Sequence, residues 1–190
     1  MPKSKAINIL APIEACLFGG FIIYTLACTV LPILAKPTTF ELLMALFSAL
    51  AIFYYLSLNS KLGDARALLC AGNALVLLVL VFGLYFSQTI SYINHSAILC
   101  YAAAIFMMLT VIAEANGILC RRYLRRYISY APVAVVLAFA LSVPDLIYAV
   151  INLSAPLNNI YYDFIFLGLA AYHLVRLITL AKVTPAEEEK

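Results

Sequence analysis

The sequence predicts an all-α integral membrane protein, a bundle of six transmembrane helices with both termini in the cytoplasm. Three observations lead to this prediction. The composition is too apolar for water, six apolar stretches are long enough to cross a bilayer, and nearly all basic residues fall on one side. Of the 190 residues, 66% are hydrophobic and 11% are charged, whereas a soluble domain carries about 25% charged residues. Lipid is therefore the expected solvent, and the cell membrane the expected location.

The six apolar stretches follow one another as a single transmembrane domain, residues 1–190. A helix needs about 20 residues to cross the hydrocarbon layer, whereas a barrel strand shows a shorter, alternating pattern. These stretches are continuous, so they predict helices, which satisfy their backbone groups internally. They cover residues 12–35, 40–58, 67–87, 96–119, 131–153 and 160–181.

The residues that bound each stretch support this division. The first stretch is longer than the apolar region of a signal peptide, about 7–15 residues, so we interpret it as a retained first helix. Each later boundary is a short polar or proline-containing segment, which predicts that consecutive helices are antiparallel neighbours in three hairpins. These connecting segments begin at Lys36, Asn59, Gln88, Arg121 and Ser154.

Basic residues set the orientation of the bundle. Of the 12 lysines and arginines, only Lys36 lies on the side opposite to the rest. Cytoplasmic loops carry the excess of Lys and Arg in membrane proteins. An even number of spans then places both termini in the cytoplasm.

Tyrosine is the only amphipathic aromatic residue available for the membrane interfaces. The chain has 13 Tyr and no Trp, and most of the tyrosines lie near the ends of the apolar stretches. Because the Tyr ring prefers the headgroup level with its hydroxyl in water, we expect these residues to form the interfacial belt.

An inner layer of ionisable residues lies near the cytoplasmic ends of the stretches. It contains Glu14, Glu114, His173 and Arg176. At the rise of an α-helix, Glu14, Glu114 and Arg176 lie within roughly 10 Å of that boundary, and His173 lies one turn deeper. Such residues are costly inside a membrane and are usually paired or functional. One interpretation is a salt bridge from Arg176 to Glu14 or Glu114 that locks the bundle. The alternative is a proton relay through Glu114 and His173.

An outer layer of carboxylates is the candidate substrate site. It contains Glu41, Asp145 and Asp163. Asp145 is the strongest candidate, because the preceding Pro144 removes a helix hydrogen bond and favours a kink that would expose carbonyls beside the carboxylate. Glu41 and Asp163 instead lie near helix N-termini, where the helix dipole favours a negative charge in any protein.

The densest charge cluster is the cytoplasmic loop with Arg121, Arg122, Arg125 and Arg126. Each juxtamembrane arginine gains about 1 kcal/mol from anionic lipid headgroups. We therefore expect the loop to anchor the protein to lipid, with docking of a cytoplasmic partner as the alternative.

Several kinds of chemistry have no motif in this sequence. There is no Gly-rich phosphate loop and no His-Glu-x-x-His or Gly-x-Ser-x-Gly motif, so no catalytic residue and no cofactor are assigned. The five cysteines are scattered rather than grouped as metal ligands. Nucleic acid is not an expected partner, because the basic residues do not cover a soluble face.

Three functions remain as hypotheses. The first is a small-solute transporter or the substrate-binding subunit of one, with a cationic or amine-bearing solute at the outer carboxylates. The length and span number are similar to those of the substrate-binding subunits of energy-coupled vitamin uptake systems, which implies an ATPase or a second membrane subunit as partner. The second is a membrane enzyme for lipid or isoprenoid substrates, using Glu114 and His173. The third is a non-catalytic membrane scaffold or assembly protein.

The orientation gives a first testable prediction. We expect alkaline phosphatase fused after Lys190 to be inactive and a green fluorescent protein fused there to be fluorescent, because positive charge keeps that end in the cytoplasm. The matched control is a phosphatase fusion in the segment after Lys36, which should be active. An active phosphatase at the C-terminal end would contradict the predicted orientation.

Overall fold

The protein is all-helical over the residues that the computed structural model describes, which are 5–31, 36–58, 64–87, 95–119, 124–152 and 157–183. Within these ranges there are no strands, and the six helices are each long and apolar enough to cross a membrane. The predicted six-helix membrane fold is therefore confirmed. The helices are α1 (Lys5–Val30), α2 (Thr39–Ser57), α3 (Ala65–Ser87), α4 (His95–Leu119), α5 (Leu124–Asn152) and α6 (Leu157–Val183).

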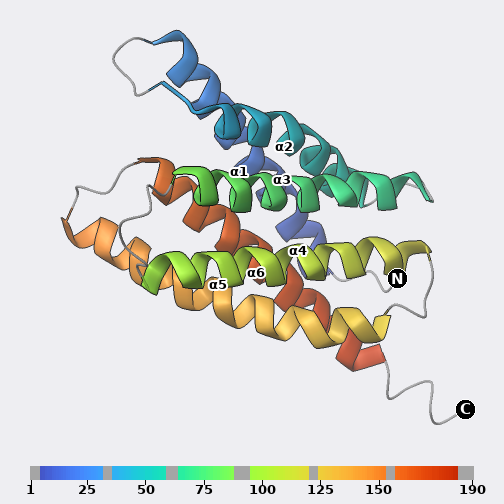
Figure 1. Cartoon of the computed structure of the whole chain (residues 1–190). Helices are drawn as coiled ribbons and strands as arrows, with labels where there is room; N and C mark the ends of the chain where they lie inside the picture. The colour runs from blue at the N-terminus through green and yellow to red at the C-terminus, as the bar shows by residue number, and fades with distance from the viewer. Residues whose placement is uncertain are drawn as a thin grey trace, which may run out of the picture.

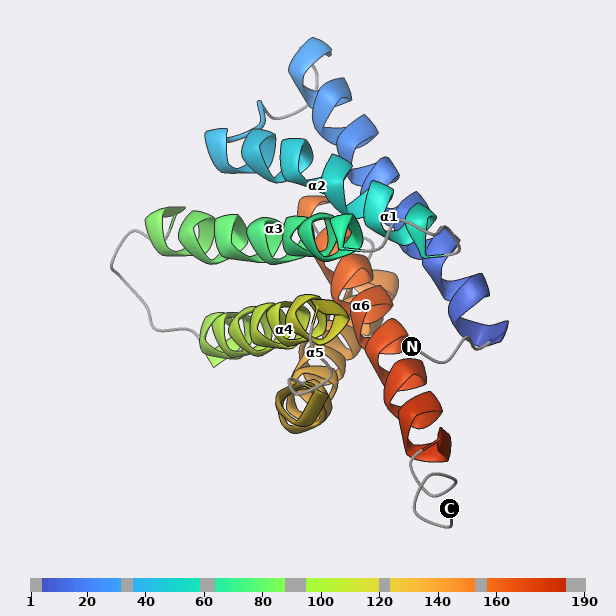
Figure 2. The same cartoon turned by 90° about the vertical axis from the view of Figure 1, so that its right-hand side faces the viewer.

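The helices form a ring that follows the order of the chain. Each helix packs against the next one along the sequence, and α6 packs against α1 to close the ring. Figure 1 shows the first residues of α1 and the last of α6 towards the same end of the bundle, on the right of the view. Figure 2 looks from that end and shows the ring order. We call it the basic end, because Arg66, Arg125, Arg126 and Lys182 lie there. Side chains that point inward from different helices therefore meet inside the ring.

Helix boundaries follow local capping rather than hydropathy. At the start of α2 the Thr38 hydroxyl accepts from the Glu41 amide at 3.2 Å, and the Glu41 carboxylate accepts from the Thr38 amide at 2.6 Å. This reciprocal arrangement is a capping box, which satisfies two amide donors at the helix start. At the other end of α1, the helix stops at Val30, two residues before Pro32. Proline disfavours helical backbone in the residue that precedes it.

Two helices begin several residues before the apolar stretches that predicted them. Helix α1 begins at Lys5 instead of residue 12, and α5 begins at Leu124 instead of residue 131. Hydropathy reports which residues suit hydrocarbon, whereas backbone hydrogen bonds decide where a helix ends. Both helices therefore extend past their apolar stretch at the basic end.

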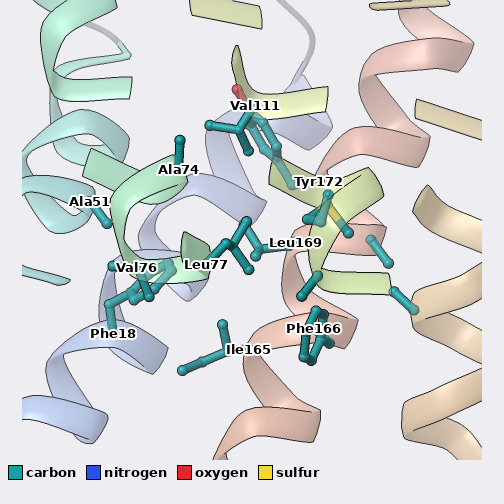
Figure 3. Close-up of a cluster of buried hydrophobic side chains, with 14 of the residues drawn as sticks. Phe18, Ala51, Ala74, Val76, Leu77, Val111, Ile165, Phe166, Leu169 and Tyr172 are labelled. Carbon is teal, nitrogen blue, oxygen red and sulfur yellow. The ribbon is translucent and has the colours of Figure 1, made fainter. Parts of the chain in front are cut away.

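The outside of the ring is apolar and the inside is closely packed. Large apolar side chains face outward on every helix, for example Val30, which is 77% exposed. Such exposure suits lipid, which solvates these side chains as well as a protein core does. Inside, one apolar cluster includes residues of all six described helices. Figure 3 shows part of it, with Leu77 of α3 and Leu169 of α6 pointing toward each other.

Small residues set the closest helix contacts. Gly72 lies in α3 where it meets α2, and a Cβ atom built on it would lie 2.5 Å from the Leu50 Cβ and 3.3 Å from the Ala51 amide nitrogen. Both neighbours are rigid parts of α2, so only a residue without a side chain fits. Membrane helices use such small residues to bring their backbones together.

This contact leads to a stability prediction. We expect Gly72→Ala to lower stability by about 1–3 kcal/mol, the usual penalty for overpacking, measured as a lower thermal midpoint in detergent. The matched control is Gly19→Ala, because a Cβ there would meet only the flexible Ile52 Cδ1 at 4.0 Å. Equal midpoints for the two variants would contradict the predicted close approach of α2 and α3.

Candidate functional site

A buried carboxylate, Glu114, is the centre of a polar network inside the ring. Its Oε1 accepts hydrogen bonds from the hydroxyl of Tyr54, from the hydroxyl of Tyr172 at 2.9 Å, and from the guanidinium of Arg176. Glu114 is 2% exposed and Arg176 is 6% exposed. Helices α2, α4 and α6 are thus joined across the interior through one carboxylate oxygen.

Arg176 is held by more than its salt bridge. Its Nη1 donates to the Tyr172 hydroxyl at 2.6 Å, one turn away on α6. The guanidinium carbon also lies 5.6 Å from the ring centre of Tyr127 and 5.7 Å from that of Tyr172. Positions i and i+4 share one face of a helix, and an aromatic face stabilises a nearby cation. The buried charge is therefore compensated by a carboxylate and by two rings.

His173 extends the network to α5. Its Nδ1 lies 3.0 Å from the Tyr127 hydroxyl and 3.7 Å from Glu114 Oε2. Within the described part of the chain, its Nε2 has no hydrogen-bond partner. The structure therefore brings Glu114 and His173 together, as an acid–base pair requires, but both side chains are closed off from the surface.

A second set of polar side chains adjoins this network. Asn73 of α3 donates from Nδ2 to the Tyr55 hydroxyl at 3.1 Å. The Tyr55 ring meets the Tyr172 ring edge to face at 5.3 Å. Because Tyr172 also binds Glu114, rings connect the two sets without a shared hydrogen bond.

Glu14 is buried near this second set and apart from the ion pair. It is 0% exposed and packs against Gly168 of α6, where a Cβ atom would overlap its carboxylate. Of the two partners that the sequence offered for Arg176, the structure selects Glu114. Neither oxygen of Glu14 meets a hydrogen-bond donor within the described residues.

The outer carboxylates are more scattered. Glu41 belongs to the capping box of α2, the role expected of an acidic residue at a helix start. Asp163 is buried, and Asp145 is exposed on α5, close enough for the two charges to repel. Helix α5 is continuous through Pro144. The structure therefore brings Asp145 near Asp163, and it gives Glu41 a structural role of its own.

The arginine loop is described only in part. Arg125 and Arg126 are exposed in the first turn of α5, at the basic end. Arg121 and Arg122 lie outside the described residues. Lipid anchoring by this loop stays a prediction.

The tyrosine belt expected from the sequence is wrong for three residues. Tyr54, Tyr55 and Tyr127 lie near the ends of their apolar stretches, yet they are buried inside the ring. Burying a tyrosine requires a partner for its hydroxyl, and each of these three has one. Position near a span end does not show which way the ring points. Tyr55 shares one face of its helix with Ser48, and both are buried. That shared face was the signal in the sequence that Tyr55 points inward.

This arrangement can hold paired buried charges. Among the described residues, no three His, Cys, Asp or Glu side chains are grouped as metal ligands. Glu114 Oε1 accepts three hydrogen bonds. A buried ion pair is stable only when such additional hydrogen bonds satisfy its charged groups.

No protein-family model matches this chain, and comparisons with curated proteins and with solved structures find no significant match. The chemistry of the site is therefore the basis for any functional proposal.

The ion pair leads to a prediction about coupled stability. We expect Glu114→Gln and Arg176→Gln each to cost about 3–5 kcal/mol, because each leaves a buried charge or its hydrogen-bond partners uncompensated. The double variant should cost less than the sum of the two, which a double-mutant cycle of unfolding free energies in detergent measures. Arg125→Gln, at an exposed arginine, is the control and should change little. Strict additivity of the two single variants would contradict a direct pair.

Proposed function

We propose that the protein is a small-solute carrier whose path runs through the interior of the helix ring. The observation that carries the proposal is the network centred on Glu114 and Arg176. Ionisable side chains that face the inside of a membrane bundle are expensive and usually mark a substrate or ion pathway. Here they come from several helices, and all of them point inward.

The position of the network suits a gate. It joins α2, α4 and α6, which are alternate members of the ring and do not pack side by side as ring neighbours do. On the side of the basic end, side-chain hydrogen bonds join these three helices across the interior. Breaking a few polar bonds would let these helices separate, as when one part of a transporter rocks against another.

The outer carboxylates indicate from which end of the ring the solute enters. Asp163 is buried near the end of the ring opposite the basic end, and Asp145 is exposed close by. A negative charge at that end would raise the local concentration of cations. We therefore propose a cationic or amine-bearing solute, which enters from the end that carries Asp163.

An enzyme is a weaker second candidate. The 3.7 Å distance between His173 and Glu114 favours it. Three donors already occupy the other oxygen of Glu114, however, and neither residue reaches the surface where a lipid headgroup could bind. A saturated buried pair suits closure of the interior better than proton transfer to a substrate.

A transport measurement tests the proposal. The full chain is purified gently, the small molecules that accompany it are identified by mass spectrometry, and each is loaded into liposomes that contain the protein. We expect one of these solutes to exchange across the bilayer. The Glu114→Gln/Arg176→Gln double variant should raise the exchange rate at least about tenfold, because the gate no longer closes.

The control is Arg125→Gln, which should exchange the solute at the wild-type rate. Wild-type liposomes without exchange of any accompanying solute would contradict carrier function. If an ATPase accompanies the chain and exchange occurs only in its presence, the chain would instead be a substrate-binding subunit.

A further inference from the structure

Glu14 and Asn73 carry three buried oxygen acceptors that meet no donor within the described residues. Both carboxylate oxygens of Glu14 and the Oδ1 of Asn73 have no hydrogen-bond partner within the described residues. Glu14 is 0% exposed and Asn73 is 2% exposed. Burying an unpaired polar group costs a few kcal/mol, and an unpaired ionised carboxylate costs far more. These three oxygens therefore carry a free-energy cost that Glu114 Oε1, with its three donors, does not.

Tyr55 connects the two residues. Its hydroxyl accepts from the Asn73 amide at 3.1 Å, and it lies close enough to the Glu14 carboxylate for the two to interact electrostatically. The Tyr55 ring also stacks with Phe18 at 6.1 Å between ring centres, one turn along α1 from Glu14. The acceptors thus share a site with two aromatic rings, built from α1, α2 and α3.

The position of the site is near the middle of the bundle. Glu14 packs against Gly168, the twelfth of the 27 residues of α6. Gly168 is eight residues from Arg176 on that helix, about 12 Å further from the basic end. The site therefore lies between the outer carboxylate Asp163 and the Glu114 network, where a carrier holds its solute.

We infer that Glu14, Asn73 and Tyr55 form a binding site for the ammonium group of a small primary amine. The inference rests on the carrier function proposed above and specifies the class of solute. It is carried by the three unpartnered acceptors and their place in the ring.

The balance of donors and acceptors identifies the ligand chemistry. A primary ammonium group has three N–H donors and no acceptor, which matches two carboxylate oxygens and one amide oxygen. Its positive charge compensates the buried Glu14 carboxylate. An anion would meet three acceptors and the Glu14 charge, so it would be repelled.

Gly168 makes room for the carboxylate. A Cβ atom at this position would lie 2.8 Å from Glu14 Cδ and overlap one of its oxygens. Any larger residue at position 168 must therefore move the carboxylate. Gly168→Ala changes the site geometry while it leaves every charge in place.

Ligand-induced stabilisation tests the inference with methylammonium chloride as the probe. The full chain in lipid nanodiscs is heated with rising concentrations of the probe, and sodium chloride and tetramethylammonium chloride at equal ionic strength are the controls. A ligand that binds only the folded state raises the thermal midpoint by mass action. We expect methylammonium to raise the midpoint, and tetramethylammonium, which has no N–H donor, to raise it less.

Two variants locate the effect. Glu14→Gln should keep or raise the midpoint without ligand, because it removes a buried charge that has no partner, and it should weaken methylammonium binding at least about tenfold. Gly168→Ala should weaken binding in the same direction. Asp64→Asn, at an exposed carboxylate directly before α3 at the basic end, should bind as the wild type does.

Three results would overturn the site. Equal stabilisation of the wild type and Glu14→Gln would show that the carboxylate does not bind the cation. A response that is the same for sodium and methylammonium would show only a general effect of salt. Loss of binding in Asp145→Asn with full binding in Glu14→Gln would move the site to the outer carboxylates.

Failure of the site and failure of the carrier function are distinguishable. If the wild type and Glu14→Gln exchange a solute at equal rates, the result supports the carrier function and overturns the binding site. Methylammonium binding that depends on Glu14, with no exchange of any solute, supports the site and overturns the carrier function.

Discussion

The ion pair of Glu114 and Arg176 is the constraint on which the interior of this protein depends. In a bundle surrounded by lipid, each charge without the other would carry a desolvation cost of several kcal/mol. The pair is therefore stable only while α4 and α6 hold their relative positions, with Tyr54 of α2 and Tyr172 completing its hydrogen bonds. Apolar packing against lipid offers no comparable directionality, because lipid tails solvate apolar side chains as well as other helices do.

Two buried glutamates in the same ring show how environment decides a role. Glu114 receives three donors on one oxygen, whereas neither oxygen of Glu14 receives any within the described residues. The first is satisfied and holds helices together. The second carries a free-energy cost that a structural residue would not need, since a leucine or glutamine would fill the same place at lower cost. That contrast is why we assign closure to one carboxylate and ligand binding to the other.

Much of the fold could be predicted from the sequence, and the polar interior only in part. Runs of apolar residues long enough to cross a bilayer leave few alternatives to helices, so the six helices were predictable. Glu14, Glu114, His173 and Arg176 stood out because charged residues are rare in such runs. Their pairing could not be predicted, since helical spacing shows which residues share a face of one helix but not which helices meet. For the same reason, position near a span end predicts an interfacial place for Tyr54, Tyr55 and Tyr127, although the three rings are buried inside the ring of helices.

The sequence by itself determined that the protein crosses a membrane as six helices, since hydropathy and helix length act locally and need no tertiary contact. It also determined which side chains would be costly to bury. Only the tertiary structure decided that the helices close into a ring, that Arg176 pairs with Glu114 and not with Glu14, and that Tyr54 and Tyr55 point inward. Those outcomes depend on the rotation of each helix about its axis. That rotation is set by packing between helices, such as the approach of α2 to Gly72, and not by the sequence of any one helix.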